Sequence, residues 1–346
     1  YDVLHSLWFT NERESVHGCS TGDEPVLTTN GYKPIGELDP NTDLLVSYES
    51  SKDVIRRGGS NKPGFSFEVA SRPYSGDLLT ISAGNESTRV TPNHKLTVRW
   101  TRECERHWAV YLMRKGSDWR VGVTKFNKEK NYTCSGISAR MHAERADAAW
   151  VLGVFDSKHD ALFHEKLWSN IYKVPDLTFV ANDGSLSEHC LTSDDLAAIW
   201  SQIDSESGAK ELLAARSLFA EYPLYERSKN GVAGRKIQSG YRVKWTTAAA
   251  NLIPGLMEVP VDPGSGQSPE WHAVNVERSH FDGDVFSLDV EKHHHYVSNG
   301  VITQNSLWGY PRIGYAYRFW WSFWFNWGLA DRHFEKDADP PTIVRY

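Results

Sequence analysis

The stretch Cys19-Ser-Thr-Gly-Asp-Glu-Pro-Val-Leu-Thr-Thr-Asn-Gly-Tyr-Lys-Pro-Ile-Gly-Glu-Leu38 predicts a short apolar strand, a glycine-containing turn and a second apolar segment. Its first residue, Cys19, carries a thiol, which is a good nucleophile even when only partly ionised. Further strand-like segments, separated by Gly, Asn and Asp turns, lie at residues 44–48, 78–81 and 96–100. The chain up to about Cys104 therefore predicts a strand-rich fold that begins with a cysteine nucleophile.

Three later segments share this strand-like texture and carry residues suited to acyl transfer. Arg89-Val-Thr-Pro-Asn-His94 places a Thr and a His three residues apart at the end of a predicted strand. Gly283-Asp-Val-Phe-Ser-Leu-Asp-Val290 predicts another strand, followed by His294 and Tyr296. Finally, Asn299-Gly-Val-Ile-Thr-Gln-Asn305 ends directly before Ser306, whose hydroxyl can accept an acyl group.

In order and spacing, these four segments resemble the splicing motifs of inteins. The resemblance implies a mainly β, horseshoe-like Hint splicing domain with an inserted α+β domain. The intein would run from Cys19 to Asn305, which is 287 residues (305 − 19 + 1). Residues 1–18 and 306–346 would be flanking extein segments, so we expect the chain to be a segment of a longer precursor. The flanks would be its partners, and splicing would need no cofactor.

By this resemblance, Cys19 attacks the carbonyl of Gly18 and converts the amide into a thioester. The equilibrium normally favours the amide, so the fold must strain the bond or stabilise the tetrahedral intermediate. His94, with an unperturbed pKa of about 6.5, would protonate the departing nitrogen. Thr91 would give a hydroxyl hydrogen bond to the same junction.

The later steps belong to the other end of the segment. Ser306 would attack the thioester and take over the upstream flank as a branched ester. Asn305 would then cyclise to a succinimide and release the joined flanks. His294, which lies 11 positions before Asn305, has the spacing of the family's histidine that promotes this cyclisation.

Two positions depart from the family pattern. Most inteins have a His before the terminal Asn, and this chain has Gln304. An amide can donate a hydrogen bond but cannot shuttle a proton, so cyclisation would depend more on His294. The slot that often holds an Asp near the first nucleophile has Ser287, while Asp289 lies on the same strand face two residues on. We expect Asp289 to be part of the catalytic set, and which of the two contacts Cys19 stays open.

A bare splicing domain needs far fewer than 287 residues, so the chain predicts an insertion. The expected division is an N-terminal splicing region at 19–107, an inserted domain at 108–239 and a C-terminal splicing region at 240–305. Within the insertion, two strands around Lys115 and Gly116 predict a hairpin. A helix, a strand at 149–155 and a second helix from about Lys158 follow.

This order of elements resembles a GIY-YIG homing endonuclease. Tyr111 matches the first motif tyrosine, Arg140 the phosphate-binding arginine and Glu165 the metal ligand, which would hold Mg²⁺ while the unit bound double-stranded DNA. Arg120 stands where the second tyrosine belongs, which predicts weak or absent cleavage. The segment Val151-Leu-Gly-Val-Phe-Asp156 lacks the second copy and the glycine of a LAGLIDADG nuclease, so it reads as a buried strand.

Composition limits the other classes of function. With 346 residues, 40% hydrophobic residues and a net charge of −6, the chain predicts a globular protein with room for more than one core. Its four cysteines show no metal-type spacing and too low a density for a disulfide framework, which favours a reducing, cytoplasmic setting. The apolar stretch 319–330 is too short to span a membrane, so no membrane partner is expected.

The segment 306–346 loosely resembles a tailed-phage portal protein. Two other functions compete with splicing. One is hedgehog-like or bacterial intein-like autocleavage without ligation, and the Asn305-Ser306 pair argues against it because cleavage alone needs neither residue. The other is a non-catalytic viral structural protein with an inert insertion. The masses of the products formed in a reducing cytosol distinguish all three.

Overall fold

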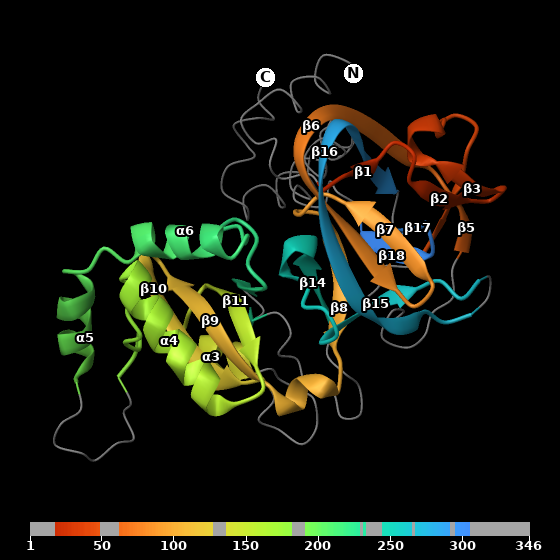
Figure 1. Ribbon diagram of the computed structural model, residues 1–346. Coiled ribbons are helices and arrows are strands. Elements are labelled where there is room, and N and C mark those ends of the chain that lie inside the picture. Colours follow the sequence, from red (N-terminus) through yellow and green to blue (C-terminus); the bar gives the residue numbers. More distant parts are fainter. Residues whose placement is uncertain are drawn as a thin grey trace, which may run out of the picture.

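The computed structural model describes residues 18–48, 62–126, 136–181, 191–228, 231–232, 244–264, 267–290 and 295–304. His294, Asn305, Ser306 and most of both flanks lie outside the described residues. Figure 1 shows the described elements in two groups, a large group of strands and a smaller sheet with helices beside it. The predicted mainly β fold is confirmed.

Thirteen strands form the large sheet, in the order β1-β7-β6-β16-β15-β8-β18-β17-β2-β4-β5, with β14 paired to β8 and β3 to β2. Their bounds are β1 (Ser20–Thr21), β2 (Pro25–Thr28), β3 (Gly31–Pro34), β4 (Leu45–Ser47), β5 (Lys62–Phe65), β6 (Phe67–Ala83), β7 (Glu86–Val90), β8 (Lys95–Trp100), β14 (Lys244–Ala248), β15 (Met257–Val261), β16 (Glu270–Val290), β17 (His295–Ser298) and β18 (Val301–Gln304). Three short 3₁₀ turns, η2 (Ile35–Glu37), η3 (Glu103–Arg106) and η4 (Ala249–Asn251), connect elements.

The longest pairing joins β6 to β16, two segments far apart in the sequence. It runs antiparallel from Ala83 opposite Val274 to Phe67 opposite Val290, and Figure 1 shows it as a long curved ribbon. Near Phe286, β16 also pairs with β1, so it lies between β6 and the strand that follows Cys19. This register brings residues of β6 and β16 beside Cys19.

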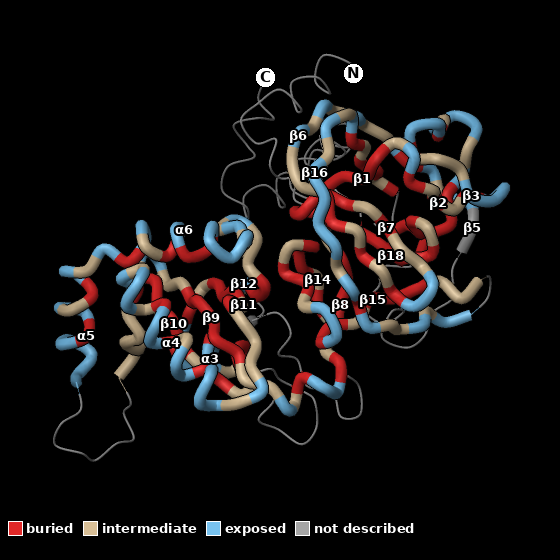
Figure 2. Tube along the Cα trace, in the orientation of Figure 1, coloured by how far each residue is buried: buried red, intermediate tan, exposed pale blue. Residues whose placement is uncertain are grey.

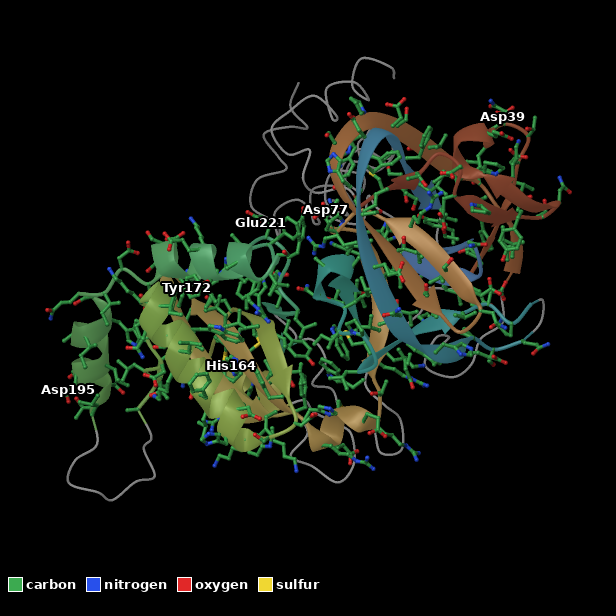
Figure 3. The ribbon with its side chains drawn as sticks, viewed as in Figure 1. Asp39, Asp77, His164, Tyr172, Asp195 and Glu221 are labelled. Atoms are coloured by element: carbon green, nitrogen blue, oxygen red, sulfur yellow. The ribbon has the colours of Figure 1, made fainter. Side chains whose placement is uncertain are left out.

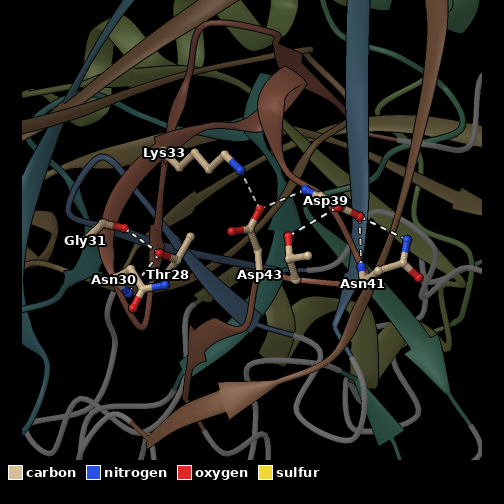
Figure 4. Close-up of polar contacts among 8 residues, drawn as sticks. Thr28, Asn30, Gly31, Lys33, Asp39, Asn41 and Asp43 are labelled. Atoms are coloured by element: carbon tan, nitrogen blue, oxygen red, sulfur yellow. Dashed lines mark hydrogen bonds and ion pairs between the residues drawn. The ribbon is translucent and has the colours of Figure 1, made fainter.

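A local hydrogen-bond network fixes the β2–β3 hairpin and the connection to β4 (Figure 4). The Thr28 hydroxyl donates to the Gly31 carbonyl (2.8 Å), and Gly31 has a φ of +107°, which glycine adopts without steric cost. The Asp43 carboxylate accepts from Lys33 Nζ (2.7 Å) and from the Asp39 N–H (2.8 Å). These contacts hold the chain where it enters the β4–β5 edge of the sheet.

The smaller sheet has the strand order β10-β9-β11-β12-β13. Its elements are β9 (Trp108–Lys115), β10 (Asp118–Lys125), β11 (Ala148–Phe155), β12 (Tyr225–Ser228), β13 (Gly231–Val232), and the accompanying helices α3 (Gly136–Glu144), α4 (Lys158–Tyr172), α5 (Ser193–Trp200) and α6 (Glu206–Ala215). The predicted hairpin forms with Gly116 at a φ of +59° in its two-residue loop. All these elements lie within 108–239, and the boundaries of a separate domain stay a prediction.

Helix α4 shows how the sequence sets one of these elements. The Ser157 hydroxyl caps its first turn by accepting from the Asp160 N–H (3.0 Å), and the left-handed residue Lys173 ends it. Glu165 lies on its buried face, and Figure 3 shows His164 and Tyr172 on the same helix. None of the helices in the described ranges is long and apolar enough to cross a membrane.

Aromatic side chains connect the two sheets. The Trp100 indole N–H at the end of β8 donates to the Tyr225 hydroxyl on β12 (2.8 Å), and its ring lies 4.9 Å from that of Phe126 and 5.2 Å from that of Trp245. Figure 2 shows buried residues in both groups of elements, and one apolar cluster contains residues of both. The smaller sheet is thus packed against the larger one.

Candidate functional site

Cys19 lies in the interior beside the turn that follows β7, and its side chain is 1% exposed. Its backbone N–H donates to the Thr91 hydroxyl oxygen (2.8 Å), and its carbonyl accepts from the Thr91 N–H (2.8 Å). Thr91 therefore binds both backbone groups of Cys19. This fixes the orientation of the Gly18–Cys19 peptide bond.

The turn from Thr91 to His94 is closed by its own hydrogen bonds. The Thr91 hydroxyl donates to Asn93 Oδ1 (2.7 Å), and the His94 N–H donates to the Thr91 carbonyl (2.9 Å). Because the hydroxyl proton is used on Asn93, the Thr91 oxygen is left to accept from Cys19. The three-residue spacing read from the sequence thus places both Thr91 and His94 at one peptide bond.

His94 packs against Gly18 and is fully buried. A Cβ on Gly18 would lie 2.2 Å from the His94 Cα. Any other residue at position 18 would therefore force its own backbone and that of His94 apart. Burial lowers the pKa of His94 to about 4, and the facing Gly18 backbone opposes this shift. The unperturbed value of about 6.5 therefore does not apply in the folded protein, and the ring is neutral near pH 7.

Arg72 lies beside the Cys19 thiol, a contact that the sequence did not reveal. Arg72 is opposite Val285, and Val285 is opposite Thr21, so the three strands β6, β16 and β1 bring the arginine next to the junction. Burial raises the pKa of the Cys19 thiol, while the charge and a hydrogen bond of Arg72 oppose the shift. The site thus combines a buried thiol with a cation that stabilises its ionised form.

The strand register places both Ser287 and Asp289 on β16, the strand that pairs with β1. Ser20 is opposite Phe286, and continuing this antiparallel register by one residue brings Cys19 opposite Ser287, which is 2% exposed. Asp289 lies two residues further along, opposite Glu68. Ser287 and Asp289 lie two residues apart on the same face of β16, so the expected role of Asp289 stays a prediction, as does which of the two contacts Cys19.

Tyr296 on β17 connects this junction to the last described strand. It is completely buried, and burial raises its pKa to about 12, while the neighbouring hydroxyls of Thr303 and Ser20 oppose the shift. Its ring lies edge-on to the His94 ring with centroids 6.5 Å apart. Ser20 follows Cys19 and Thr303 precedes Gln304, so the upstream junction and the end of β18 meet at one phenol.

Gln304 is the last described residue before the expected downstream junction. Its side chain is buried, and its carboxamide nitrogen lies 2.8 Å from the hydroxyl oxygens of both Thr97 and Thr246. His294, Asn305 and Ser306 lie outside the described residues, so their expected roles stay predictions. Neither threonine belongs to a splicing motif quoted from the sequence.

The four residues expected to form a nuclease site lie near one another, Tyr111 and Arg120 on two strands of the smaller sheet and Arg140 and Glu165 on helices α3 and α4. Tyr111 is 1% exposed, and burial raises its pKa to about 12; the charges acting on it come from Arg120, Glu144, Arg140 and Glu165. Burial likewise raises the pKa of the Glu165 carboxyl. In the part of the chain that the structure describes, no group of three or more His, Cys, Asp or Glu side chains could hold a metal ion.

Arg120 occupies the position of the missing tyrosine and has its own partners. Its guanidinium is buried, forms an ion pair with Glu144 and donates to the Asp176 carbonyl (3.0 Å). Glu144 also accepts from the Phe179 N–H (3.2 Å). Removing one partner of such a buried pair is strongly destabilising, so Arg120 and Glu144 support the fold of this unit. The sequence offered no signal for Glu144.

A scan against protein-family models and a search of curated proteins find no match. A search of solved structures finds the solution structure of a KlbA intein precursor from Methanococcus jannaschii, with 12% sequence identity and a TM-score of 0.35. The alignment covers 84% of this chain and 91% of the other. The geometry of the site, and not this weak similarity, carries the functional argument.

Proposed function

We propose that this chain excises its own segment Cys19–Asn305 and joins the residues on either side by protein splicing. The observation that carries the proposal is the buried Gly18–Cys19 peptide bond. Thr91 binds the backbone on both sides of the nucleophile, and His94 packs against the acyl residue. This arrangement brings a thiol, the acyl carbon that it attacks and a proton carrier to one place, as an acyl shift requires.

In the first step, Cys19 Sγ attacks the Gly18 carbonyl carbon, and the bond between that carbon and the Cys19 nitrogen breaks. Arg72 favours the ionised thiol, which is the reactive form. The thiol proton ends on the departing nitrogen as the tetrahedral intermediate breaks down, and His94, which packs against Gly18, is the group placed to deliver a proton there. An imidazolium whose pKa is only about 4 is a strong acid, so it gives up this proton readily. The products are a thioester and the free amine of Cys19.

The next steps proceed at the downstream junction. The Ser306 hydroxyl attacks the thioester carbon, releases the Cys19 thiol and becomes an ester of the upstream flank. The Asn305 side-chain nitrogen then attacks its own backbone carbonyl, with His294 promoting the proton transfers, and the bond to Ser306 breaks. The freed Ser306 amine takes over the acyl group and forms a normal peptide bond. In this proposal no cofactor enters these steps. Residues 108–239 would form an inserted domain that contributes no group to them.

Intact mass spectrometry of the expressed full chain tests this proposal. Splicing gives an excised 287-residue segment (305 − 19 + 1) and a ligated product of the two flanks. Cys19→Ala should abolish thioester formation and release of residues 1–18 by dithiothreitol. Asn305→Ala should block cleavage before Ser306 and leave the thioester step intact. Separate flanks without ligated product would favour autocleavage, and an unchanged chain in all three proteins would favour a structural role.

For the inserted unit, we propose a GIY-YIG-like scaffold that cuts DNA weakly or not at all. The supporting observation is the Arg120–Glu144 pair, which fills the place of the second phenol and leaves Tyr111 buried. The test is nicking of DNA that carries the uninterrupted host sequence, by the full chain with Mg²⁺ or Mn²⁺. Brisk cleavage that Glu165→Ala removes would overturn this view.

A further inference from the structure

The 3₁₀ turn η4 is hydrogen-bonded to residues 91–94, which we call the catalytic turn. The Ala249 N–H donates to the His94 carbonyl (2.7 Å), and the Ala250 N–H donates to the Pro92 carbonyl (2.8 Å). The catalytic turn in its own right holds the scissile peptide bond of the upstream junction. A displacement of η4 is therefore passed to the residues that hold this peptide bond.

Asn251 is the last residue of η4, and its side chain fixes this turn. The side chain is buried, and its amide nitrogen donates to Thr247 Oγ1 (3.0 Å), four residues earlier on β14. The same nitrogen donates to the Tyr222 carbonyl (2.9 Å), which comes from the chain before β12 of the smaller sheet. A carbonyl only accepts, so the nitrogen of the carboxamide and not its oxygen must face Tyr222. Both amide hydrogens are thus used, and they close the chain from Thr247 to Asn251.

The surroundings of η4 exclude water. Ala249 is 1% exposed and Leu252 8%, and both belong to the apolar cluster that contains residues of both sheets. Figure 1 shows β14, which leads into η4, on the side of the larger group that faces the smaller sheet. A hydrogen bond lost in such a place leaves a buried polar group without a partner, which costs more than exchanging the bond for one with water.

We infer that Asn251 is a positioning residue for the first step of splicing, because it fixes η4 and η4 holds the catalytic turn in place. Asn251 acts through the backbone of Ala249 and Ala250 and takes no part in the chemistry. An acyl shift needs the thiol, the acyl carbon and the proton carrier in close alignment, and a misplacement of about 1 Å can slow such a step about a hundredfold. A looser turn therefore slows the step without removing any reacting group. This inference rests on the proposed splicing function.

The two acceptors of Asn251 belong to different parts of the chain. Thr247 lies in the expected C-terminal splicing region, and Tyr222 lies within residues 108–239. Asn251 therefore keeps its Thr247 partner when residues 108–239 are replaced with a linker. For this reason we expect the thioester step to survive that replacement but not the loss of the Asn251 carboxamide.

The first experiment measures release of residues 1–18 by excess dithiothreitol from the full chain that carries Asn305→Ala, so that the acyl shift sets the rate. Asn251→Leu removes both hydrogen bonds at similar side-chain size and should slow release by about tenfold. Thr247→Val removes one of them and should slow release by about threefold, and Thr247→Ser should restore the rate. In the Asn251→Leu background, Thr247→Val should have no additional effect, because it acts through Asn251.

The matched control is Thr101→Val, the same change at another buried threonine. The Thr101 hydroxyl donates to the Gly255 carbonyl (3.3 Å) and not to a group of η4. Thr101→Val should therefore release residues 1–18 at the parent rate.

Amide hydrogen exchange separates positioning from general stability and does not depend on splicing. In the Cys19→Ala, Asn305→Ala chain, the His94 N–H is protected by its bond to the Thr91 carbonyl (2.9 Å). Asn251→Leu should make this amide exchange about tenfold faster, while the amides of β6 that pair with β16 exchange at the parent rate. A variant that only lowers global stability would speed exchange in both places.

The outcomes are distinct for Asn251 and for splicing itself. Parent-like release in both Asn251→Leu and Thr247→Val, or an unchanged exchange rate of the His94 amide, would overturn the inference. Equal slowing by Thr101→Val, or by Thr247→Val with and without the Asn251 carboxamide, would also overturn it. If the Asn305→Ala parent releases no upstream flank, the proposed splicing function fails instead, and the exchange rates still decide whether Asn251 holds the catalytic turn.

Discussion

Replacing His94 with Gln removes an imidazole that is fully buried beside the Gly18–Cys19 peptide bond. In the folded protein burial lowers the His94 pKa to about 4, whereas the unfolded chain has the ordinary value of about 6.5. Between these values the unfolded state binds a proton that the folded state does not. His94 therefore lowers the stability of the wild-type protein as the pH falls below about 6.5, and the loss is complete below about 4.

The size of this effect follows from the two pKa values. The gap between about 6.5 and about 4 corresponds to a total loss of about 3 kcal/mol in the free energy of unfolding. About 2 kcal/mol of this appears between about pH 7 and pH 5, because the unfolded state is then almost fully protonated. Since the ring has no solvent exposure, no large correction for screening applies.

Urea unfolding at a series of pH values measures this difference, in a Cys19→Ala, Asn305→Ala background so that no peptide bond rearranges during the titration. Other groups, such as the buried Glu24 with its raised pKa, titrate in both proteins and cancel in the comparison. The stability of the His94 protein relative to His94→Gln should fall by about 2 kcal/mol from pH 7 to pH 5. Curves that stay parallel would refute the low pKa and the proton transfer built on it.

Three other predictions follow from the same geometry. Gly18→Ala should slow thioester formation, measured by dithiothreitol release, because its Cβ would lie 2.2 Å from a backbone atom of the facing histidine. Arg72→Met should shift the pH profile of Cys19 alkylation upward, whereas Arg278→Met on the same ribbon, whose arginine pairs with an aspartate, should leave it unchanged. Replacing residues 108–239 with a Gly/Ser linker should preserve the thioester step. It should lower the free energy of unfolding in urea by about 2 kcal/mol, because it removes Tyr225 and exposes the Trp100 side chain to water.

Local sequence patterns predicted the parts of the site that depend on short-range structure. The spacing of Thr91 and His94 needs only one turn, and that turn places both residues at Cys19. The hairpin around Gly116 likewise follows from turn chemistry. Such features are readable because their hydrogen bonds join residues that are close in the sequence.

The remaining contacts depend on strand register over long separations, which leaves no local signal. Arg72 reaches Cys19 only because β6 pairs with β16 along all of its residues, from Phe67 to Ala83. Thr97 and Thr246 face each other although they are 149 positions (246 − 97) apart in the sequence. Nor does the sequence show the low pKa of His94, because it arises from burial by elements that come from several parts of the chain.

Tyr296 lies between the upstream junction and the end of β18, where the proposed reaction would need no proton relay. Its hydroxyl neighbours are Ser20, next to the upstream nucleophile, and Thr303, next to Gln304. With a pKa of about 12, the phenol stays protonated near neutral pH, so it cannot act as a base there. A neutral, fully buried phenol contributes mainly through the packing of its ring. In the proposed reaction, Tyr296 therefore separates the upstream junction from the end of β18 without carrying a proton between them.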